Sequence, residues 1–158
     1  MTRSPATAAV RVRRAELSDL DDLVALEEAT FDSDKISRAQ FRRHLDSDTA
    51  RVLVASANHR RFLGTAMVFF RKGSRAARLY SIASLPEARG KGVGTALIEA
   101  AEMAAQQRHC DALRLEVRTD NDSAIRLYER LGYRRVHPIK KAFYEDGSDA
   151  FVYEKTLT

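Results

Sequence analysis

Apolar and polar positions along the chain alternate in several short stretches, which is the pattern of β-strands that bury one face. The alternation is strictest at residues 113–118, where Leu, Leu and Val are separated by Arg, Glu and Arg. Residues 10–15 alternate apolar residues with arginine in a similar way. Further strands are predicted at residues 51–57, 62–70, 79–84, 133–136, 141–145 and 151–153. Pro138 is expected to interrupt pairing between two of them.

Apolar residues that recur every three or four positions predict helices between these strands. Residues 18–21 form a capping-box-like start for a first helix, and Ser37 can cap a second one. A long alanine-rich helix is predicted to begin at Thr95. A fourth helix at about 123–131 ends before Gly132, which suits the C′ position.

The order of these elements, βααββ(β)αβαββ, predicts a single α/β (α+β) domain over residues 10–158. Its sheet is expected to be mixed and mostly antiparallel, with about seven strands flanked by about four helices. Residues 1–9 are small and polar, and we expect them to form a flexible N-terminus. The length of 158 residues is common for one domain.

Composition excludes several classes of protein. No apolar run approaches the roughly 18 residues of a membrane span, and the N-terminal segment lacks the apolar stretch of a secretory signal. The single cysteine, Cys110, rules out an internal disulfide framework and a cysteine-based metal cage. We therefore expect a cytoplasmic protein that binds no metal and no membrane.

The net charge of +5 is unevenly distributed. Residues 51–110 hold ten basic and three acidic side chains, whereas the flanking parts of the chain are near neutrality. A basic region can indicate nucleic-acid binding. However, the sequence has no RNA-binding aromatic signature, zinc-finger spacing or strongly basic helix, so a polyanionic cofactor is the better explanation.

A glycine-rich segment inside this basic region links the fourth strand to the long helix. It consists of Arg89, Gly90, Lys91, Gly92, Val93, Gly94 and Thr95. Glycines let the backbone approach a ligand closely, and the first turn of the helix offers N–H groups without intrahelical partners. Together with the two cations, these donors favour a phosphate or pyrophosphate site.

Three other kinds of glycine-containing segment fit these residues less well. The Rossmann fingerprint needs a third glycine where Thr95 stands. The Gly-x-x-x-x-Gly-Lys-Ser/Thr pattern of a P-loop is absent. A plain strand-to-helix turn is the remaining alternative, but such turns seldom combine three glycines with two cations.

Two titratable side chains beyond the glycine segment are candidates for proton transfer. Glu116 lies on the polar face of its strand between Arg114 and Arg118, so it is either a neutralised surface glutamate or a base near the ligand. Tyr128 lies on the apolar face of the last helix, so it is either a core aromatic or a hydroxyl donor, for example to a sulfur atom. On spacing alone the structural interpretation leads for both.

The glycine segment resembles the Q/R-x-x-G-x-G/A signature of the GNAT superfamily of acetyltransferases, with Arg89, Gly92 and Gly94 in its fixed positions. In that family the loop binds the pyrophosphate of acetyl-CoA. The resemblance implies that residues 90–95 hold this group through backbone N–H groups. It also implies that Ile82, Ala83 and Ser84 pair with the pantetheine amides, that Asn121 positions the pantetheine arm, and that the sheet is splayed at this site.

Two further stretches are similar to the RimI-like, ribosomal-protein-alanine type of N-terminal acetyltransferases. Residues 115–118 (LEVR), followed by Tyr128 on the next helix, match a strand glutamate that acts as base and a tyrosine that acts as acid. Residues 143–150 resemble the family's Tyr-Tyr-x-x-Gly-x-Asp-Ala stretch, which implies that Phe143 and Tyr144 contact the acceptor. Phe143 stands where the family usually has tyrosine.

The expected function is therefore direct transfer of an acetyl group from acetyl-CoA, as co-substrate, to a primary amine. A protein N-terminus, whose pKa is roughly 7.7–8.0, loses its proton far more readily than a lysine near 10.4, which favours an N-terminal α-amine. Two alternatives stay open: acetylation of a polyamine or aminoglycoside, and a sensor that binds acetyl-CoA without turnover. We expect a monomer or homodimer without direct nucleic-acid binding.

Overall fold

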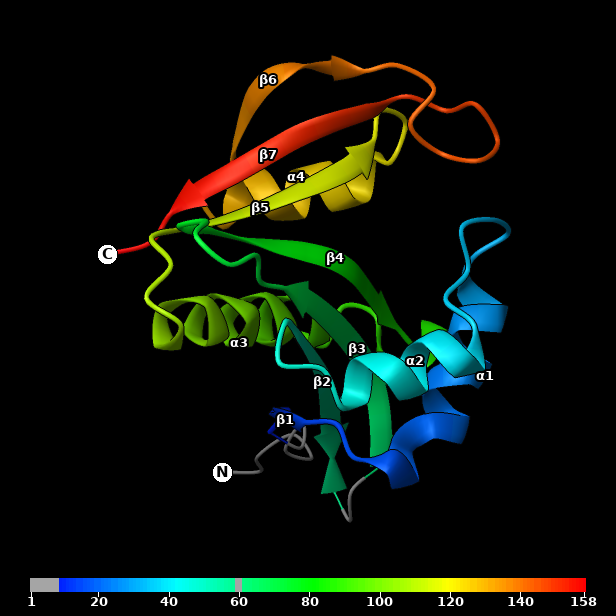
Figure 1. Cartoon of the computed structure of the whole chain (residues 1–158). Coiled ribbons are helices and arrows are strands. Elements are labelled where there is room, and N and C mark those ends of the chain that lie inside the picture. The colour runs from blue at the N-terminus through cyan, green and yellow to red at the C-terminus, as the bar shows by residue number, and fades with distance from the viewer. Residues whose placement is uncertain (1–8, 59–60) are drawn as a thin grey trace, which may run out of the picture.

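The computed structural model describes residues 9–58 and 61–158 (Figure 1). The flexible N-terminus expected at residues 1–9 lies, except for residue 9, outside this described part. The strands are β1 (Arg11–Arg14), β2 (Ala50–Ala57), β3 (Arg61–Phe69), β4 (Ala76–Ser84), β5 (Ala112–Arg118), β6 (Arg134–Lys140) and β7 (Ala150–Thr156). The helices are α1 (Leu20–Thr30), α2 (Arg38–Leu45), α3 (Val93–Gln107) and α4 (Asp122–Arg130), with 3-10 turns at Leu17–Asp19 and Pro86–Ala88.

The seven strands form one sheet in the order β1-β2-β3-β4-β5-β7-β6. All neighbouring pairs are antiparallel except β4 and β5, which are parallel. The crossover from β4 to β5 runs through α3, as parallel neighbours require. This confirms the predicted domain with a mixed, mostly antiparallel sheet and four α-helices.

Alternation along β2 divides the core between the two faces of the sheet. Val52 and Val54 pack in one buried cluster with Phe41 of α2, whereas Leu53 and Ala55 belong to a second cluster that includes α3. In β5 the residues Leu113, Leu115 and Val117 join this second cluster, together with Tyr128 of α4. Helices α1 and α2 therefore cover one face of the first half of the sheet, while α3 and α4 cover the opposite face (Figure 1).

β4 and β5 part midway along their length. Their register joins residues 76–79 of β4 to residues 112–115 of β5 and stops there, although both strands continue. The register of β3 with β4 also shifts between Met67 and Val68, which leaves Tyr80 as the extra residue of a bulge. The strands consequently splay, and residues 80–84 of β4 keep one backbone edge unpaired on the side of β5.

Gly64 of β3 permits the close packing beside this opening. A Cβ placed on Gly64 would lie 2.6 Å from the carbonyl oxygen of Ala83 and 3.2 Å from Cγ1 of Val93. The backbones of β3 and β4 and the start of α3 therefore meet at a point with no room for a side chain. Any larger residue here would push apart the elements that form the splay.

The region after Gly132 differs from the sequence prediction. β6 is a single strand that runs through Pro138, with its pairing to β7 interrupted between Val136 and Lys140, as the proline requires. The separate strand predicted at residues 141–145 is wrong, because this segment turns back on itself. Asp149 accepts the Ala142 N–H at 2.9 Å, and Ser148 accepts the Tyr144 N–H at 3.1 Å, so local bonds replace a strand ladder.

Candidate active site

Two hollows meet where β4 and β5 diverge. A groove of about 1020 Å³ runs past the glycine segment and the N-terminal ends of α3 and α4. A smaller cavity of about 440 Å³ lies farther in, between β4, β5 and the loops before α2 and β7. We call them the glycine-loop groove and the inner cavity. Both are lined by Phe31, Ser33, Ile82, Arg118, Asn121, Ala124 and Tyr128.

The glycine segment is built to present backbone donors. Gly90 and Gly92 have φ values of 78° and 82°, in the left-handed region that favours glycine, although a Cβ at either position would meet no atom within 4 Å. Gly92 is the N-cap of α3, which begins at Val93, two residues earlier than predicted. The N–H groups of the first three helical residues therefore have no acceptor within their own helix.

Arginine side chains surround these donors. Arg89 lines the glycine-loop groove, and so do Arg126 and Arg130 of α4, which the sequence did not single out. Three helix N-terminal N–H groups beside three guanidinium groups fit a pyrophosphate by charge and by donor number. Lys91 lines neither hollow, and its N–H donates to the carbonyl oxygen of Ala88 at 3.3 Å, so its assignment as a ligand residue stays a prediction.

The remaining residues assigned to the cofactor lie along the same groove. Ile82, Ala83 and Ser84 line it at the unpaired edge of β4, where main-chain groups are free to pair with an extended ligand. Asn121 also lines it, at the N-terminal end of α4. Its side-chain oxygen already caps α4, at 3.3 Å from the N–H of Ala124, which leaves its amide nitrogen for other contacts.

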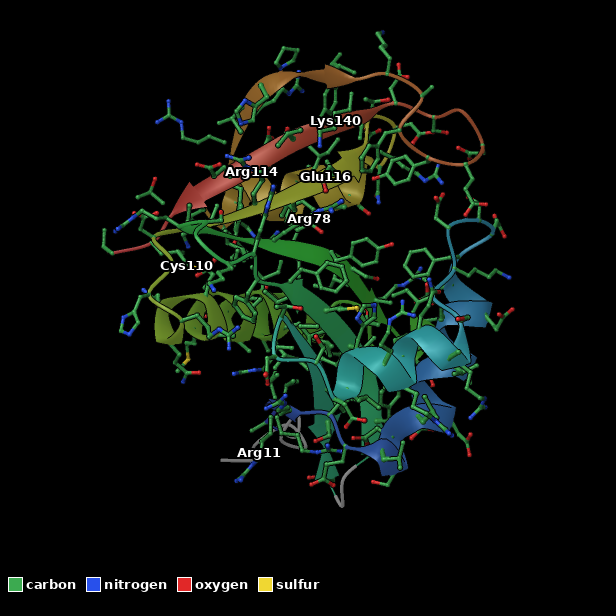
Figure 2. The ribbon with its side chains drawn as sticks, in the orientation of Figure 1. Arg11, Arg78, Cys110, Arg114, Glu116 and Lys140 are labelled. Carbon is green, nitrogen blue, oxygen red and sulfur yellow. The ribbon has the colours of Figure 1, made fainter. Side chains whose placement is uncertain are left out.

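Glu116 lies at the floor of the inner cavity and is held by two cations. Its Oε1 accepts from Nε of Arg78 at 2.8 Å, and its Oε2 accepts from Nζ of Lys140 at 3.1 Å (Figure 2). The side chain is only 6% exposed. Arg114 and Arg118, which flank it in sequence, pair with Glu154 and Asp146 instead. A carboxylate has further lone pairs, so it can still accept from a water or an amine in the cavity.

Tyr128 lies where the inner cavity and the glycine-loop groove meet. It is 5% exposed, and its ring packs edge-on against Tyr133 with the centroids 6.0 Å apart. Within the described residues no group hydrogen-bonds to its hydroxyl, whereas the hydroxyl of Tyr133 donates to Glu102. Burial raises the pKa of Tyr128, with a smaller contribution from Tyr144, so the hydroxyl remains a proton donor at neutral pH.

Phe143 and Tyr144 form the wall of the inner cavity on the side of the loop before β7. Their rings pack edge-on at 4.9 Å, and the guanidinium of Arg118 lies 4.2 Å from the centre of the Tyr144 ring. Burial, with the nearby carboxylates of Glu116 and Asp34, raises the pKa of Tyr144 to about 12 against the opposing effect of Arg118. Its hydroxyl is therefore also protonated at neutral pH.

The loop between α1 and α2 is fastened to the loop before β7 across the mouth of the inner cavity. Oδ2 of Asp34 lies 3.2 Å from the backbone nitrogen of Glu145 and 3.9 Å from Nη2 of Arg118. Arg118 also pairs with Asp146 at 2.9 Å. The carboxylate of Asp34 therefore joins two loops that are far apart in sequence.

Besides Arg126 and Arg130, three further residues of the site could not be identified from the sequence. Arg78 and Lys140 reach Glu116 from β4 and β6, which lie on either side of the β5–β7 pair in an order that no local pattern reveals. Glu27 of α1 is 3% exposed, lines the inner cavity, and accepts the N–H of Ile36 at 2.8 Å. A glutamate within an apolar helical face was the only available signal for Glu27. Burial raises its pKa.

The described residues offer neither a metal-binding cluster nor a membrane-spanning helix. Within residues 9–58 and 61–158, no three His, Cys, Asp or Glu side chains are grouped so that they could hold a metal ion. None of the helices in this part of the chain is long and apolar enough to cross a membrane. Cys110 is buried and unpaired, and burial raises the pKa of its thiol, so its sulfur is a small apolar group in the core.

Comparison with known proteins identifies the family. A model of the acetyltransferase (GNAT) family matches residues 17–133. An N-alpha-acetyltransferase of Sulfurisphaera tokodaii is 29% identical over 158 aligned positions, which cover 93% of each chain. Another, of Saccharolobus solfataricus, is 38% identical over 84 residues, but this alignment spans only half of that relative and 52% of the present chain.

Solved structures agree with this assignment. The ribosomal-protein-S18-alanine N-acetyltransferase of Escherichia coli superposes with a TM-score of 0.80 at 25% identity, covering 95% of both chains. Ard1 of Thermoplasma volcanium superposes with a TM-score of 0.81 at 25% identity, covering 95% of the present chain and 99% of that one. The chain thus belongs to the GNAT family of acetyltransferases. It is an N-acetyltransferase of the type that uses acetyl-CoA as acetyl donor.

Proposed function

We propose that this enzyme acetylates the α-amino group of a peptide or protein N-terminus. The observation that carries the proposal is the charge balance of the inner cavity. The carboxylates of Glu116 and Asp34 are each paired with cations, from Arg78, Lys140 and Arg118. Glu27 accepts a backbone N–H from Ile36, so the three carboxylates at the cavity, Glu27, Asp34 and Glu116, are matched by three cations. The cavity therefore has no surplus negative charge for a polyamine or an aminoglycoside.

The curated relatives named above support the same acceptor, because both are described as N-alpha-acetyltransferases. The solved structures are more varied, since they include a nourseothricin acetyltransferase at 25% identity and a TM-score of 0.77. Spermidine N-acetyltransferases also share the fold, at about 20% identity. Small amines are consequently the controls in the experiment below.

The donor would lie in the glycine-loop groove. The N–H groups at the start of α3, with Arg89, Arg126 and Arg130, would hold its pyrophosphate, and residues 82–84 would pair with the pantetheine amides. Bound acetyl-CoA supplies a thioester carbonyl that an amine can attack. Backbone N–H groups at the unpaired edge of β4 are the available donors for the oxyanion that forms.

The acceptor would enter the inner cavity as a neutral amine. Glu116 would take the proton that the amine loses on attack, directly or through a water, because its carboxylate lies at the cavity floor with lone pairs unused. Tyr128 would protonate the departing thiolate from the junction of the two hollows. Within the described residues its hydroxyl has no hydrogen-bond partner and stays protonated at neutral pH, so a proton is available there. Phe143 and Tyr144 would contact the backbone of the acceptor.

The test is thiol release from acetyl-CoA with matched acceptors. A short peptide with a free N-terminus and no lysine, the same peptide with a blocked N-terminus, spermidine and an aminoglycoside are compared. We expect turnover only with the free peptide, and a product whose mass and fragmentation place the acetyl group on the α-nitrogen. Faster turnover of spermidine or the aminoglycoside than of any peptide would show that the acceptor assignment is wrong.

A further inference from the structure

A row of charged side chains crosses four strands on the sheet face that α3 and α4 leave uncovered. It consists of Arg78 of β4, Arg114 of β5, Glu154 of β7 and Arg134 of β6. These residues are direct register partners, Arg78 with Arg114, Arg114 with Glu154, and Glu154 with Arg134. Register partners project from the same face of a sheet, so the four side chains lie side by side. We call this set the arginine row.

The arginine row begins at the inner cavity. Arg78 lines that cavity and bonds to Glu116 at its floor, and Arg114 lies beside Arg78 on the next strand (Figure 2). Lys140 reaches the same glutamate from the other side. A chain whose first residue occupies the cavity can therefore continue directly over the row.

The row and its neighbours carry excess positive charge. Three arginines and Lys140 face two carboxylates, Glu116 and Glu154. The side chains of Arg78 and Arg114 are each 39% exposed, so they can bind an external group while keeping their glutamate partners. Arg134 is exposed and has no ion pair within the described part of the chain. The face is thus complementary to an anion.

Length and position indicate which anion fits. Strands lie about 4.8 Å apart, so a row across four strands spans roughly 14 Å, or about four residues of an extended peptide. Guanidinium groups bind carboxylates in a bidentate manner. A nucleic acid would bring one phosphate after another onto a face where Glu116 and Glu154 interrupt the cations. A peptide can instead place its few carboxylates beside the arginines alone.

We propose that the arginine row binds acidic side chains at about positions three to six of the acceptor, with the acetylated residue counted as position one. The row then selects acceptors by the charge of this following segment, whereas the inner cavity selects the first residues. This inference rests on the proposed N-terminal acetylation for its place in the reaction. Binding of an acidic peptide to the row can be measured without any turnover.

The experiment uses peptides that share their first two residues and differ at positions three to six, which are all Glu, all Gln or all Lys. We expect kcat/KM to be about fivefold higher for the Glu peptide than for the Gln peptide at low ionic strength, and lowest for the Lys peptide. The ratio should fall towards one in about 0.5 M salt, because exposed charges are screened.

Two charge-reversal variants localise the effect. R134E should reduce the Glu-to-Gln ratio of kcat/KM to about one or below, because it reverses the sign of the unpaired member of the row. R11E is the matched control, since Arg11 is an exposed strand arginine without an ion pair in the described structure, on β1 at the opposite edge of the sheet (Figure 2). It should leave the ratio unchanged.

A binding assay separates failure of this inference from failure of the proposed function. Fluorescence anisotropy follows a labelled, N-acetylated Glu peptide, which cannot react. If peptides are acetylated equally whatever their charge, the arginine row has no such role and the proposed function stands. If no peptide reacts but the Glu peptide binds in an Arg134-dependent manner, the row stands without the proposed function. If no peptide is acetylated and the Glu peptide does not bind, both the arginine-row inference and the proposed function are overturned.

A competition experiment tests whether the arginine row binds nucleic acid instead of an acidic peptide. A short single-stranded RNA is added to the labelled Glu peptide at equal charge concentration and physiological salt. We expect little displacement of the peptide. RNA could instead displace the labelled peptide at a lower concentration than the unlabelled Glu peptide does, with this displacement absent in R134E. That result would identify the row as a nucleic-acid surface and overturn the inference.

Discussion

The backbone N–H of Glu145 donates to Oδ2 of Asp34 at 3.2 Å, although the two residues are 111 positions apart in sequence. This bond joins the loop after α1 to the loop before β7. Ser33 and Asp34 on one side, and Phe143 and Tyr144 on the other, line the inner cavity. The bond therefore closes one wall of the cavity and fixes the distance between the loops that flank the acceptor.

Loss of this bond should weaken acceptor binding more than donor binding. In Asp34→Ala the Glu145 N–H and Arg118 each lose a partner, so the loops separate more readily. We expect KM for a peptide acceptor to rise about fivefold, the effect of one or two exposed polar contacts. KM for acetyl-CoA should change less than about twofold, because the glycine segment is untouched. Steady-state kinetics with each substrate varied separately measures both constants.

Asp48→Ala is the control for the loop variant. Asp48 is an exposed loop aspartate without a side-chain ion pair in the described structure, and it lies outside both hollows. The Asp48→Ala substitution should change neither the KM for the peptide nor the KM for acetyl-CoA. Equal rises of the two KM values in Asp34→Ala would contradict a role specific to the acceptor.

Tyr128→Phe should separate catalysis from stability. The phenylalanine ring fills the same space, and the hydroxyl it lacks has no hydrogen-bond partner in the described structure, so the melting temperature should hardly change. If Tyr128 is the acid, kcat should fall about 100-fold or more, as for loss of a general acid. Binding of CoA, measured by calorimetry, should stay within about twofold.

Tyr133→Phe gives the opposite pattern and serves as the matched control. It removes a hydroxyl that donates to Glu102 at 2.7 Å, outside both hollows. We expect a loss of about 1 kcal/mol in the free energy of unfolding, with kcat close to that of the wild type. A Tyr128→Phe variant that keeps full kcat would remove this tyrosine from the mechanism.

Glu116→Gln should lower activity most at low pH. Below the pKa of the α-amine, roughly 7.7–8.0, few acceptor molecules are neutral and a proton acceptor in the cavity matters most. We expect kcat/KM to fall at least about tenfold at pH 6.5 and less at pH 9. The ratio of wild type to variant across pH is the measurement. A ratio that does not vary with pH would argue against Glu116 as base.

The stability effect of the same substitution needs its own control. Glu116→Gln leaves Arg78 and Lys140 without a carboxylate partner, which destabilises the protein independently of catalysis. Glu102→Gln removes a carboxylate that pairs with Lys155 and accepts from Tyr133 away from the site. It should lower the melting temperature without a pH-dependent loss of kcat/KM.

Glu27 should make the stability of the protein depend on pH. Burial raises the pKa of Glu27 above the 4.5 of an unperturbed glutamate, so the folded protein keeps this proton to higher pH than the unfolded chain does. Its contribution to stability is therefore full below about pH 4.5 and is lost as the pH rises through the raised pKa. Glu27→Gln keeps an acceptor for the Ile36 N–H and has no proton to lose.

The melting temperatures of wild type and Glu27→Gln should diverge as the pH rises from 4.5 to 8, with the variant the more stable at the upper end. Calorimetry at closely spaced pH values measures the difference. Glu28→Gln, at the adjacent exposed position paired with Lys35, should show no comparable trend. A constant difference between wild type and Glu27→Gln would mean that Glu27 ionises equally in the folded and unfolded states.

Local patterns were sufficient for most of the elements. Strict alternation at residues 113–118 predicted β5 and the side of the strand on which Glu116 lies, because neighbouring strand residues point to opposite faces. Ser37 was predicted to cap α2, and its hydroxyl accepts the N–H of Gln40 at 3.1 Å. The strand predicted at 141–145 was wrong, because Asp149 and Ser148 offer that backbone local partners which no alternation rule includes.

The sequence by itself determined the glycine segment, the helix behind it and the type of residue available at the site, since these depend on neighbours in the chain. Only the tertiary structure decided which groups these site residues contact. Arg78 and Lys140 meet Glu116 because β4 and β6 lie on either side of the β5–β7 pair, and Asp34 meets Glu145 because two distant loops close over the same opening. Strand order and loop closure depend on burial summed over the whole domain, and no short stretch of sequence carries that information.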